Sequence, residues 1–109
     1  MNTNNKKNIV IKIGTTSIIK NNKVDITLLK SLAELIIENK NKFNFVIVTS
    51  GAVGLGATKL NYKSRPKSLK RLQVASAVGQ IELINQYEKI FKDKKMNIAQ
   101  VLITKNLID

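Results

Sequence analysis

Two stretches of sequence decide the fold: Val10-Ile11-Lys12-Ile13-Gly14-Thr15-Thr16-Ser17 and Val46-Ile47-Val48-Thr49-Ser50-Gly51-Ala52-Val53-Gly54. In each, a run rich in β-branched residues stops at glycine and at small hydroxyl-bearing residues. Buried parallel strands typically end in this way where their backbone N–H groups meet a ligand. We therefore predict two buried parallel strands whose carboxyl ends form a binding site.

Lys12 is the one charged residue within the apolar run of the first strand. A cation buried in an apolar strand costs several kcal/mol unless an anion meets it. Gly14 follows closely and lets a ligand approach the backbone. The pattern favours an anion-binding role for Lys12, with a phosphate or a carboxylate as the counter-charge. The alternative is that its ammonium group simply reaches past the end of the sheet into water.

The composition excludes several kinds of chemistry. The 109 residues include no cysteine and no histidine, and 43% of them are hydrophobic. Disulfides, thiolate metal sites, cysteine nucleophiles and imidazole bases are therefore ruled out. No apolar run approaches the length of a membrane span, and the amino terminus lacks the apolar segment of a signal peptide. We expect a cytoplasmic protein that does not associate with membranes.

The formal net charge is +12, but lysine, asparagine and isoleucine are all abundant, which indicates a general compositional bias. One local feature remains, because residues 39–81 contain no Asp or Glu. Six cations gather there: Lys59, Lys63, Arg65, Lys67, Lys70 and Arg71. This basic patch either attracts an anionic ligand or is simply solvated. A small nucleic-acid-binding domain is the alternative from another functional class, but few aromatic residues are available to stack on bases, so we expect no nucleic acid partner.

The hydrophobic pattern predicts strands alternating with helices. Asn21-Asn22 indicates a turn, Asp25 is a good helix N-cap, and Pro66 lies in a loop. The expected strands are residues 9–13, 43–49 and 98–104, and the expected helices are residues 26–37, 51–60 and 69–91. The apolar face of the last helix is expected to comprise Leu69, Leu72, Ala75, Val78, Ile81, Ile84, Tyr87 and Phe91.

This order of elements predicts the α/β class, as a three-layer α/β/α sandwich with a mainly parallel sheet. Ligands bind such sheets at the carboxyl ends of the strands. Three strands make a thin sheet, and residues 104–109 look like a strand exit followed by the opening of a further element. We therefore expect the sandwich to be incomplete and these residues to be the first part of a longer domain.

The strand-end residues suit phosphoryl transfer. That reaction asks mainly for positioning and positive charge, which a lysine, glycine N–H groups and a helix amino end provide without histidine or cysteine. A carboxylate acceptor would need no base. The spacing of Gly51, Gly54 and Gly56 is neither that of a P-loop nor that of a dinucleotide-binding fold. Close helix-to-strand packing around Gly54 and Gly56 is the plain alternative, as is helix capping by Thr49 and Ser50.

Four motifs, in this order and spacing, resemble the amino-terminal part of the glutamate 5-kinase family, within the amino-acid kinase superfamily. They are residues 10–17, 48–54, 77–80 (Ala-Val-Gly-Gln) and 99–104 (Ala-Gln-Val-Leu-Ile-Thr). The resemblance spans nearly all of the chain but under half of the family's kinase domain. It implies that residues 1–109 are the amino-terminal portion of one amino-acid kinase domain, with no second domain within the chain.

The resemblance implies a reaction and its substrates. The family phosphorylates the γ-carboxylate of L-glutamate with ATP and Mg²⁺, giving L-glutamyl 5-phosphate in the first step of proline biosynthesis. Lys12 resembles the lysine that contacts ATP phosphate and stabilises the transferring phosphoryl group, which makes it the candidate catalytic residue. Gly14 and Thr15 would line the same phosphate-binding turn.

The second strand end carries the implied substrate site. Ser50, with Gly51 and Ala52 beside it, resembles the family's glutamate-binding position, and no residue of the chain is assigned to a metal. Gln80 and its helix are expected to be structural or to lie at a subunit interface, since the full-length family member is expected to be a homo-oligomer. The family's other substrate and nucleotide ligands would lie beyond Asp109, so we expect the 109-residue chain to be inactive alone.

Other members of the superfamily remain as alternatives. Acetylglutamate kinase, aspartokinase and the uridylate kinases share the lysine-glycine first strand. They differ at the second strand, where Thr49-Ser50-Gly51-Ala52 favours the glutamate 5-kinase pattern over a glycine triplet. A truncated gene product without activity is a further alternative.

Overall fold

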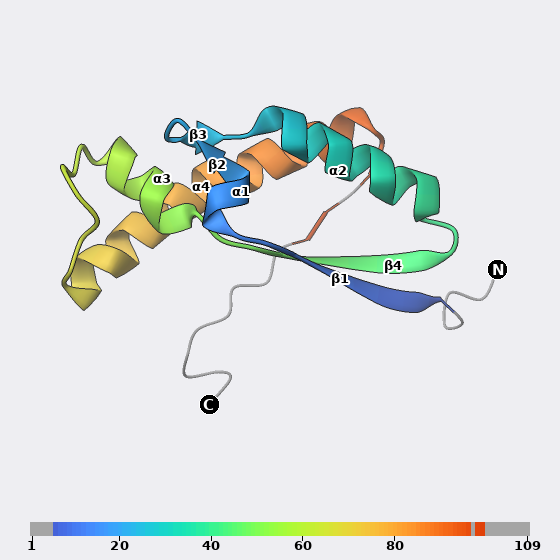
Figure 1. Cartoon of the computed structure of the whole chain (residues 1–109), viewed down its shortest axis with the longest axis horizontal. Helices are drawn as coiled ribbons and strands as arrows, with labels where there is room; N and C mark the ends of the chain where they lie inside the picture. The colour runs from blue at the N-terminus through green and yellow to red at the C-terminus, as the bar shows by residue number, and fades with distance from the viewer. Residues whose placement is uncertain (1–5, 97, 100–109) are drawn as a thin grey trace.

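Among the described residues, a two-stranded parallel sheet forms one layer of the fold (Figure 1). The computed structural model describes residues 6–96, 98 and 99. Strands β1 (Lys7–Ile13) and β4 (Phe43–Thr49) pair in register from Lys7 opposite Phe43 to Ile13 opposite Thr49. The predicted strand at residues 43–49 is confirmed at both ends.

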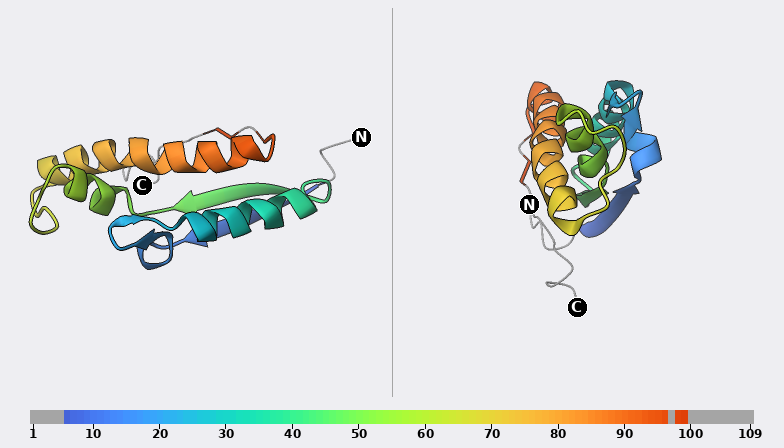
Figure 2. Two further views of the ribbon diagram at one scale, coloured as in Figure 1. Left: turned by 90° about the horizontal axis from the view of Figure 1, so that it is seen from above. Right: turned by 90° about the vertical axis from the view of Figure 1, so that its left-hand side faces the viewer.

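The two faces of this sheet differ. Ile9, Ile11 and Ile13 of β1 alternate with exposed residues, and Phe45 and Ile47 of β4 do the same. These inward residues face a core shared with helices α2 (Ile26–Asn39) and α4 (Leu69–Asp93), which contact each other over this side of the sheet (Figures 1 and 2).

The opposite face of the sheet is exposed in the part of the chain that the structure describes. Val10, Val46 and Val48 are between 46% and 60% exposed. The described residues therefore form an α/β arrangement of two layers, a sheet and the helices on one side. The α/β class and the parallel pairing are confirmed, whereas the second helical layer of the predicted sandwich is not seen among these residues.

A short helix and a hairpin follow β1. They are α1 (Thr15–Ile18), β2 (Ile19–Lys20) and β3 (Lys23–Val24), with β2 and β3 antiparallel. Asn21 and Asn22 form the connecting turn, and both have positive φ angles, 54° and 62°. Two-residue hairpin turns need this backbone conformation, which asparagine tolerates. The predicted turn is confirmed, but the hairpin around it was not predicted.

Helix α2 begins where the sequence predicted. The Asp25 side chain accepts a hydrogen bond of 3.1 Å from the backbone N–H of Leu28. The helix buries Leu29, Leu32, Ala33 and Ile36 in the core. Full burial of a leucine or isoleucine side chain contributes roughly 1.5–3 kcal/mol, so this face holds the helix on the sheet.

Two glycines set the distance between α3 (Ala52–Lys59) and α4. A Cβ atom at Gly56 would overlap the carbonyl group of Ala75, and one at Gly79 would overlap the carbonyl group of Ala52. The Cβ at Gly79 would also lie 2.6 Å from the backbone nitrogen of Gly56. The predicted packing role of Gly56 is confirmed, but its neighbour is a helix and not a strand. Outside its own helix, no atom of the described residues lies within 4 Å of the Cβ position of Gly54, so the alternative that Gly54 has the same packing role is wrong for these residues.

The predicted apolar face of α4 is wrong in part. Leu69 and Ile81 are 71% and 62% exposed, whereas Leu83 and Ile90 are buried. The residues predicted to form the apolar face are mostly three positions apart in the sequence. Such a step turns a helix by about 300°, so the row drifts about 60° around the axis at each step. The buried row advances mainly by four and comprises Ala75, Gly79, Leu83, Tyr87, Ile90 and Phe91.

The predicted third strand, residues 98–104, lies almost entirely outside the described residues. Ile98 and Ala99 are the two that are described, and they have no regular secondary structure. Within the described ranges, no helix combines the length and the apolar character that a membrane span requires.

The glycine contact between α3 and α4 gives a stability prediction. Gly56→Ala should lower the free energy of unfolding by about 3 kcal/mol or more, since the new methyl group meets backbone that cannot yield without moving a helix. Urea denaturation followed by circular dichroism measures the change.

Gly54→Ala is the matched control, because it places the same methyl group on the same helix in open space. It should raise the free energy of unfolding by about 0.5–1 kcal/mol through helix propensity. Equal destabilisation by both substitutions would contradict the packing role of Gly56.

Candidate functional site at the carboxyl ends of β1 and β4

The parallel register brings the two strand-end motifs together. Ile13 lies opposite Thr49, so the residues that follow each strand emerge side by side. The backbone N–H and the side-chain hydroxyl of Ser50 both donate to the carbonyl oxygen of Ile13, each at 3.2 Å. The Thr15 hydroxyl in turn donates to Ser50 Oγ at 3.2 Å. Thr15 and Ser50, which are 35 residues apart in sequence, therefore touch.

Lys12 lies on the exposed face of the sheet, opposite Val48 of β4. The prediction that it is embedded in a buried strand is therefore wrong for the described residues. The reason is the alternation of side chains along a strand, since Ile11 and Ile13 face the helices and Lys12 points the other way. Among the described residues, its side chain is exposed, which leaves the ammonium group accessible to an anionic ligand.

Gly14 leaves open space beside the backbone at the end of β1. Its φ angle is −77°, which any residue adopts, and no other atom lies within 4 Å of its Cβ position. The backbone conformation therefore does not require glycine here. The free space beside it agrees with the predicted approach of a ligand to this turn.

Gly51 is required by the fold itself. Its φ angle is +106°, in the left-handed region that favours glycine, and a Cβ there would lie 2.8 Å from Ile19 Cγ1. Gly51 is also the N-cap of α3, and no side chain caps this helix. The alternative that Thr49 or Ser50 caps α3 is therefore wrong. The half-buried Ala52 begins the helix, against the position of Gly79.

Tyr87 supports the end of β4, a role that sequence reasoning missed. Its hydroxyl donates a hydrogen bond of 3.0 Å to Thr49 Oγ1, although its side chain is only 4% exposed. Burial raises the pKa of the Tyr87 phenol above its ordinary value near 10, and the hydrogen bond to Thr49 acts in the opposite direction. A buried tyrosine usually finds a partner for its hydroxyl. No pattern in the sequence indicates which residue that partner is.

The described part of the site offers one cation, Lys12, together with hydroxyl groups and backbone N–H groups. No group of three or more Asp, Glu, His or Cys side chains able to hold a metal occurs among the described residues. Cations and hydroxyl donors bind phosphate and carboxylate oxygens. The arrangement is therefore suited to holding anionic oxygen atoms at the ends of the two strands.

Comparison with known proteins confirms the resemblance found in the sequence. Residues 7–108 match the amino acid kinase family. A glutamate 5-kinase from Prochlorococcus marinus subsp. pastoris is 49% identical in an alignment of 109 positions that covers 94% of this chain and 29% of the relative. A glutamate 5-kinase from Clostridium tetani is 38% identical over 94% of this chain and 40% of the relative. One from Lactococcus lactis subsp. lactis is 35% identical over 94% of this chain and 39% of the relative. The chain thus spans well under half the length of these relatives.

The Tyr87 hydrogen bond gives a prediction with a matched control. Tyr87→Phe should lower the free energy of unfolding by about 1 kcal/mol, because it removes the bond to Thr49 and keeps the buried ring. Tyr62→Phe should change it by less than about 0.5 kcal/mol. Equal losses, measured by urea denaturation, would contradict the anchoring role of Tyr87.

The raised pKa of Tyr87 predicts a pH dependence. The folded state favours the neutral phenol, so its contribution to stability is fully present below the unfolded value near 10 and declines as pH rises through the folded pKa. In Tyr87→Phe, the free energy of unfolding should lose the part of its decline at high pH that comes from ionisation of Tyr87. In the Tyr62→Phe variant, phenolate absorbance should report Tyr87 alone and show ionisation above pH 10. Ionisation below that value would contradict the burial effect.

Proposed function

The chain belongs to the amino acid kinase family, and we propose that it forms the amino-terminal part of a glutamate 5-kinase. The reaction is the transfer of the γ-phosphoryl group of ATP to the γ-carboxylate of L-glutamate, giving L-glutamyl 5-phosphate. The names of the relatives support this choice of substrate. The observation that carries the proposal is the Thr15–Ser50 contact, which unites the phosphate-type turn after β1 and the substrate-type turn after β4 in one place.

Each strand end has a separate task in this proposal. Lys12, Gly14 and Thr15 receive the phosphate oxygens of ATP. Ser50, Gly51 and Ala52 receive L-glutamate. The exposed position of Lys12 and the open space beside Gly14 leave room for the nucleotide phosphates. Because the Thr15 hydroxyl reaches Ser50, a phosphate at the first strand end would lie close to a carboxylate at the second.

The chemistry needs no general base from this chain. The γ-carboxylate is already an anion, and one of its oxygens attacks the γ-phosphorus of ATP. A new oxygen–phosphorus bond forms while the bond to the β-phosphate oxygen breaks, and ADP leaves with that electron pair. Negative charge spreads over the transferring phosphoryl oxygens in the transition state. Lys12 is proposed to stabilise that charge, and the backbone N–H groups of the turns hold the reactants in line.

Magnesium is proposed to arrive with the nucleotide, as MgATP. Mg²⁺ prefers carboxylate oxygens, water and substrate phosphates. The strand-end residues of this chain offer hydroxyl groups and one cation, and the described residues include no carboxylate cluster. These residues do not fit a Mg²⁺ site of their own, so no step of the mechanism assigns the metal to them.

Further parts of the proposal concern the complete enzyme. We place it in the cytoplasm and in proline biosynthesis, as a homo-oligomer. Residues 1–109 alone should not catalyse the reaction, because the chain spans only 29–40% of the length of the glutamate 5-kinases from Prochlorococcus, Clostridium and Lactococcus.

An activity assay tests the reaction itself. The complete reading frame that contains residues 1–109 is expressed, purified and incubated with MgATP and L-glutamate, and the acyl phosphate is trapped as the hydroxamate. We expect product with glutamate and none with N-acetylglutamate or aspartate. Product from N-acetylglutamate instead would assign the chain to another branch of the family. No turnover with any of the three would contradict the kinase proposal.

Two substitutions in that enzyme should separate the two strand ends. Lys12→Gln should lower kcat by about 100-fold or more and change the KM for glutamate little, since it removes charge stabilisation made in the transition state. Ser50→Ala should raise the KM for glutamate about tenfold. The Ser50 O–H donates to the Ile13 carbonyl in this structure, and it is proposed to turn to the substrate carboxylate when glutamate binds.

Lys7→Gln is the matched control for Lys12, because it removes an exposed lysine from the start of the same strand. Lys7→Gln should leave kcat and the KM for glutamate within about twofold of the values for the unmodified enzyme. Equal and small effects of Lys12→Gln and Ser50→Ala would mean that the strand ends only support packing.

A further inference from the structure

The loop between α3 and α4 forms a pocket lined by basic side chains. Its volume is about 470 Å³, and it extends from Tyr62 to Arg71. Four cations line it, namely Lys63, Arg65, Lys67 and Arg71. None of the strand-end residues assigned to ATP or glutamate lines it. The pocket therefore shares no lining residue with the candidate kinase site.

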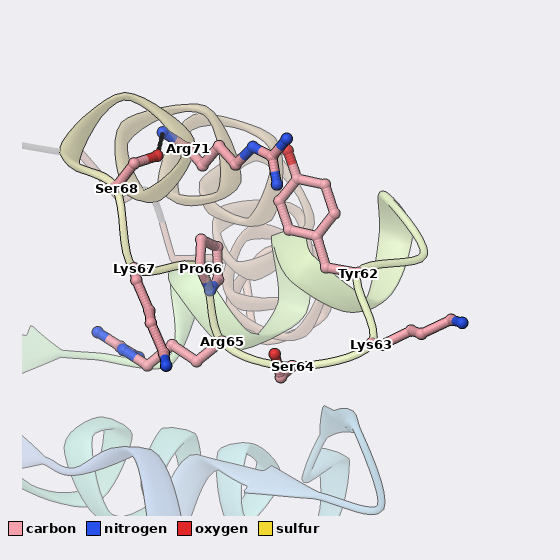
Figure 3. A pocket seen from close by; sticks show the side chains of 8 residues that line it. All are labelled: Tyr62, Lys63, Ser64, Arg65, Pro66, Lys67, Ser68 and Arg71. Atoms are coloured by element: carbon pink, nitrogen blue, oxygen red, sulfur yellow. Dashed lines mark hydrogen bonds between the residues drawn. The ribbon is translucent and has the colours of Figure 1, made fainter.

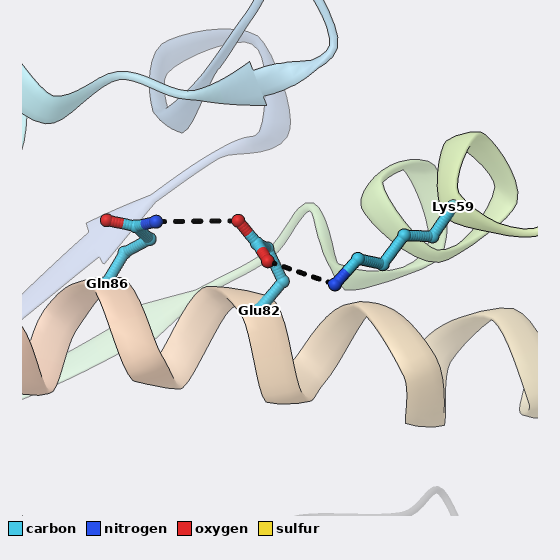
Figure 4. Close-up of polar contacts among 3 residues, drawn as sticks. All are labelled: Lys59, Glu82 and Gln86. Atoms are coloured by element: carbon cyan, nitrogen blue, oxygen red, sulfur yellow. Dashed lines mark hydrogen bonds and ion pairs between the residues drawn. The ribbon is translucent and has the colours of Figure 1, made fainter.

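Among the described residues, no carboxylate lines this pocket. Residues 39–81 include no Asp or Glu, and Glu82 is the first acidic residue after the loop. Glu82 is already engaged, since it pairs with Lys59 at 3.3 Å and accepts a hydrogen bond of 3.4 Å from Gln86 (Figure 4). That pair is the one salt bridge among the described residues, and neither of its members lines the pocket.

Several of the pocket side chains are held in place. The Arg71 guanidinium lies over the ring of Tyr62, 5.9 Å from the ring centroid. Pro66 is buried, and the Ser68 hydroxyl accepts a hydrogen bond of 3.3 Å from the backbone N–H of Arg71. A cation that is already ordered loses less conformational entropy when a ligand binds. Arg71 therefore differs from a freely moving surface cation, because its guanidinium is already positioned at the pocket.

The side chains of Arg65 and Lys67 extend to the same side of the loop, while Lys63 extends to the opposite side (Figure 3). Two like charges on one side of a loop repel each other, and an anion bound between them replaces that repulsion by attraction. The planar guanidinium of arginine matches the geometry of two phosphate oxygens, and a lysine ammonium supplies a further point charge.

From these features we propose that the pocket binds a small ligand with several phosphate groups, such as a linear polyphosphate or the phosphate chain of a nucleotide. A nucleic acid fits the pocket less well. Sequence-tolerant binding of single strands uses exposed aromatic rings on which bases stack. Tyr62 is the one aromatic residue that lines the pocket, and Arg71 already lies over its ring.

Isothermal titration calorimetry with inorganic tripolyphosphate tests this site on the complete protein that contains residues 1–109. Circular dichroism first verifies that each variant is folded. The unmodified protein should bind with a dissociation constant below about 1 mM at low salt. The double variant Arg65→Gln/Lys67→Gln should bind about tenfold more weakly, because two charge-assisted contacts are lost. Arg71→Lys keeps the charge but not the planar guanidinium, and should bind about threefold more weakly.

The matched control is the double variant Lys40→Gln/Lys42→Gln, which removes the same charge from exposed positions before β4. Its dissociation constant for tripolyphosphate should stay within about twofold of that of the unmodified protein. The weakening caused by Arg65→Gln/Lys67→Gln should persist in the Lys12→Gln background, because the two sites share no residue, so a failure of the proposed kinase site leaves this comparison valid. If Lys12→Gln abolishes binding and the loop double variant retains it, tripolyphosphate binds at the strand ends. That result would contradict the proposal that the pocket binds it.

Three further results would also overturn the proposal. The first is no measurable binding of tripolyphosphate to the unmodified protein. The second is equal weakening in the loop double variant and the Lys40/Lys42 control, which would mean that the overall charge attracts the anion. The third is a single-stranded RNA that binds more tightly than tripolyphosphate and depends on Arg65 and Lys67, which would make the loop a nucleic-acid surface.

Discussion

The close contact between α3 and α4 is the constraint on which the rest of the structure depends. Gly56 lies against the backbone of Ala75, and Gly79 lies against the backbone of Ala52, so each helix touches the other where a side chain is missing. Ala52 is the first residue of α3, and it directly follows Ser50 and Gly51. The position of α4 therefore fixes the start of α3. The Tyr87–Thr49 hydrogen bond adds a second link, between α4 and the end of β4. The candidate glutamate turn is thus held by a helix that contributes no residue to the proposed reaction.

The sheet decides which groups at the site are accessible. Because side chains alternate along a strand, Ile11 and Ile13 enter the core and Lys12 emerges on the other face. The same alternation leaves Val10, Val46 and Val48 exposed. An outward face with three valines is typical of a strand that is buried on both sides. The sequence pattern therefore agrees with a sandwich, although the described residues cover one face only.

The features that could be predicted from the sequence are those set by local chemistry. The Asp25 side chain caps a backbone N–H only three residues away. Strand β4 is a run of β-branched and aromatic residues interrupted only by Asn44. The features that were missed depend on residues distant in sequence. The burial of Leu83 and the exposure of Ile81 follow from which side of α4 meets the core. The partner of the Tyr87 hydroxyl is 38 residues away. The strand-end pairing was predicted because two similar motifs in a parallel sheet must end at the same edge.

Charge alone cannot identify a ligand site in this protein. A net charge of +12 attracts any anion over the whole surface, and salt screens this attraction within about 10 Å. A specific site must therefore add fixed geometry to the general field. The strand ends add hydroxyl groups held by hydrogen bonds to Ile13 and Ser50, with Lys12 as the nearby cation. The α3–α4 loop adds an arginine held over Tyr62 and two cations on one side. The two sites therefore use the same background charge, and what distinguishes each of them is the contacts that hold its polar groups in place.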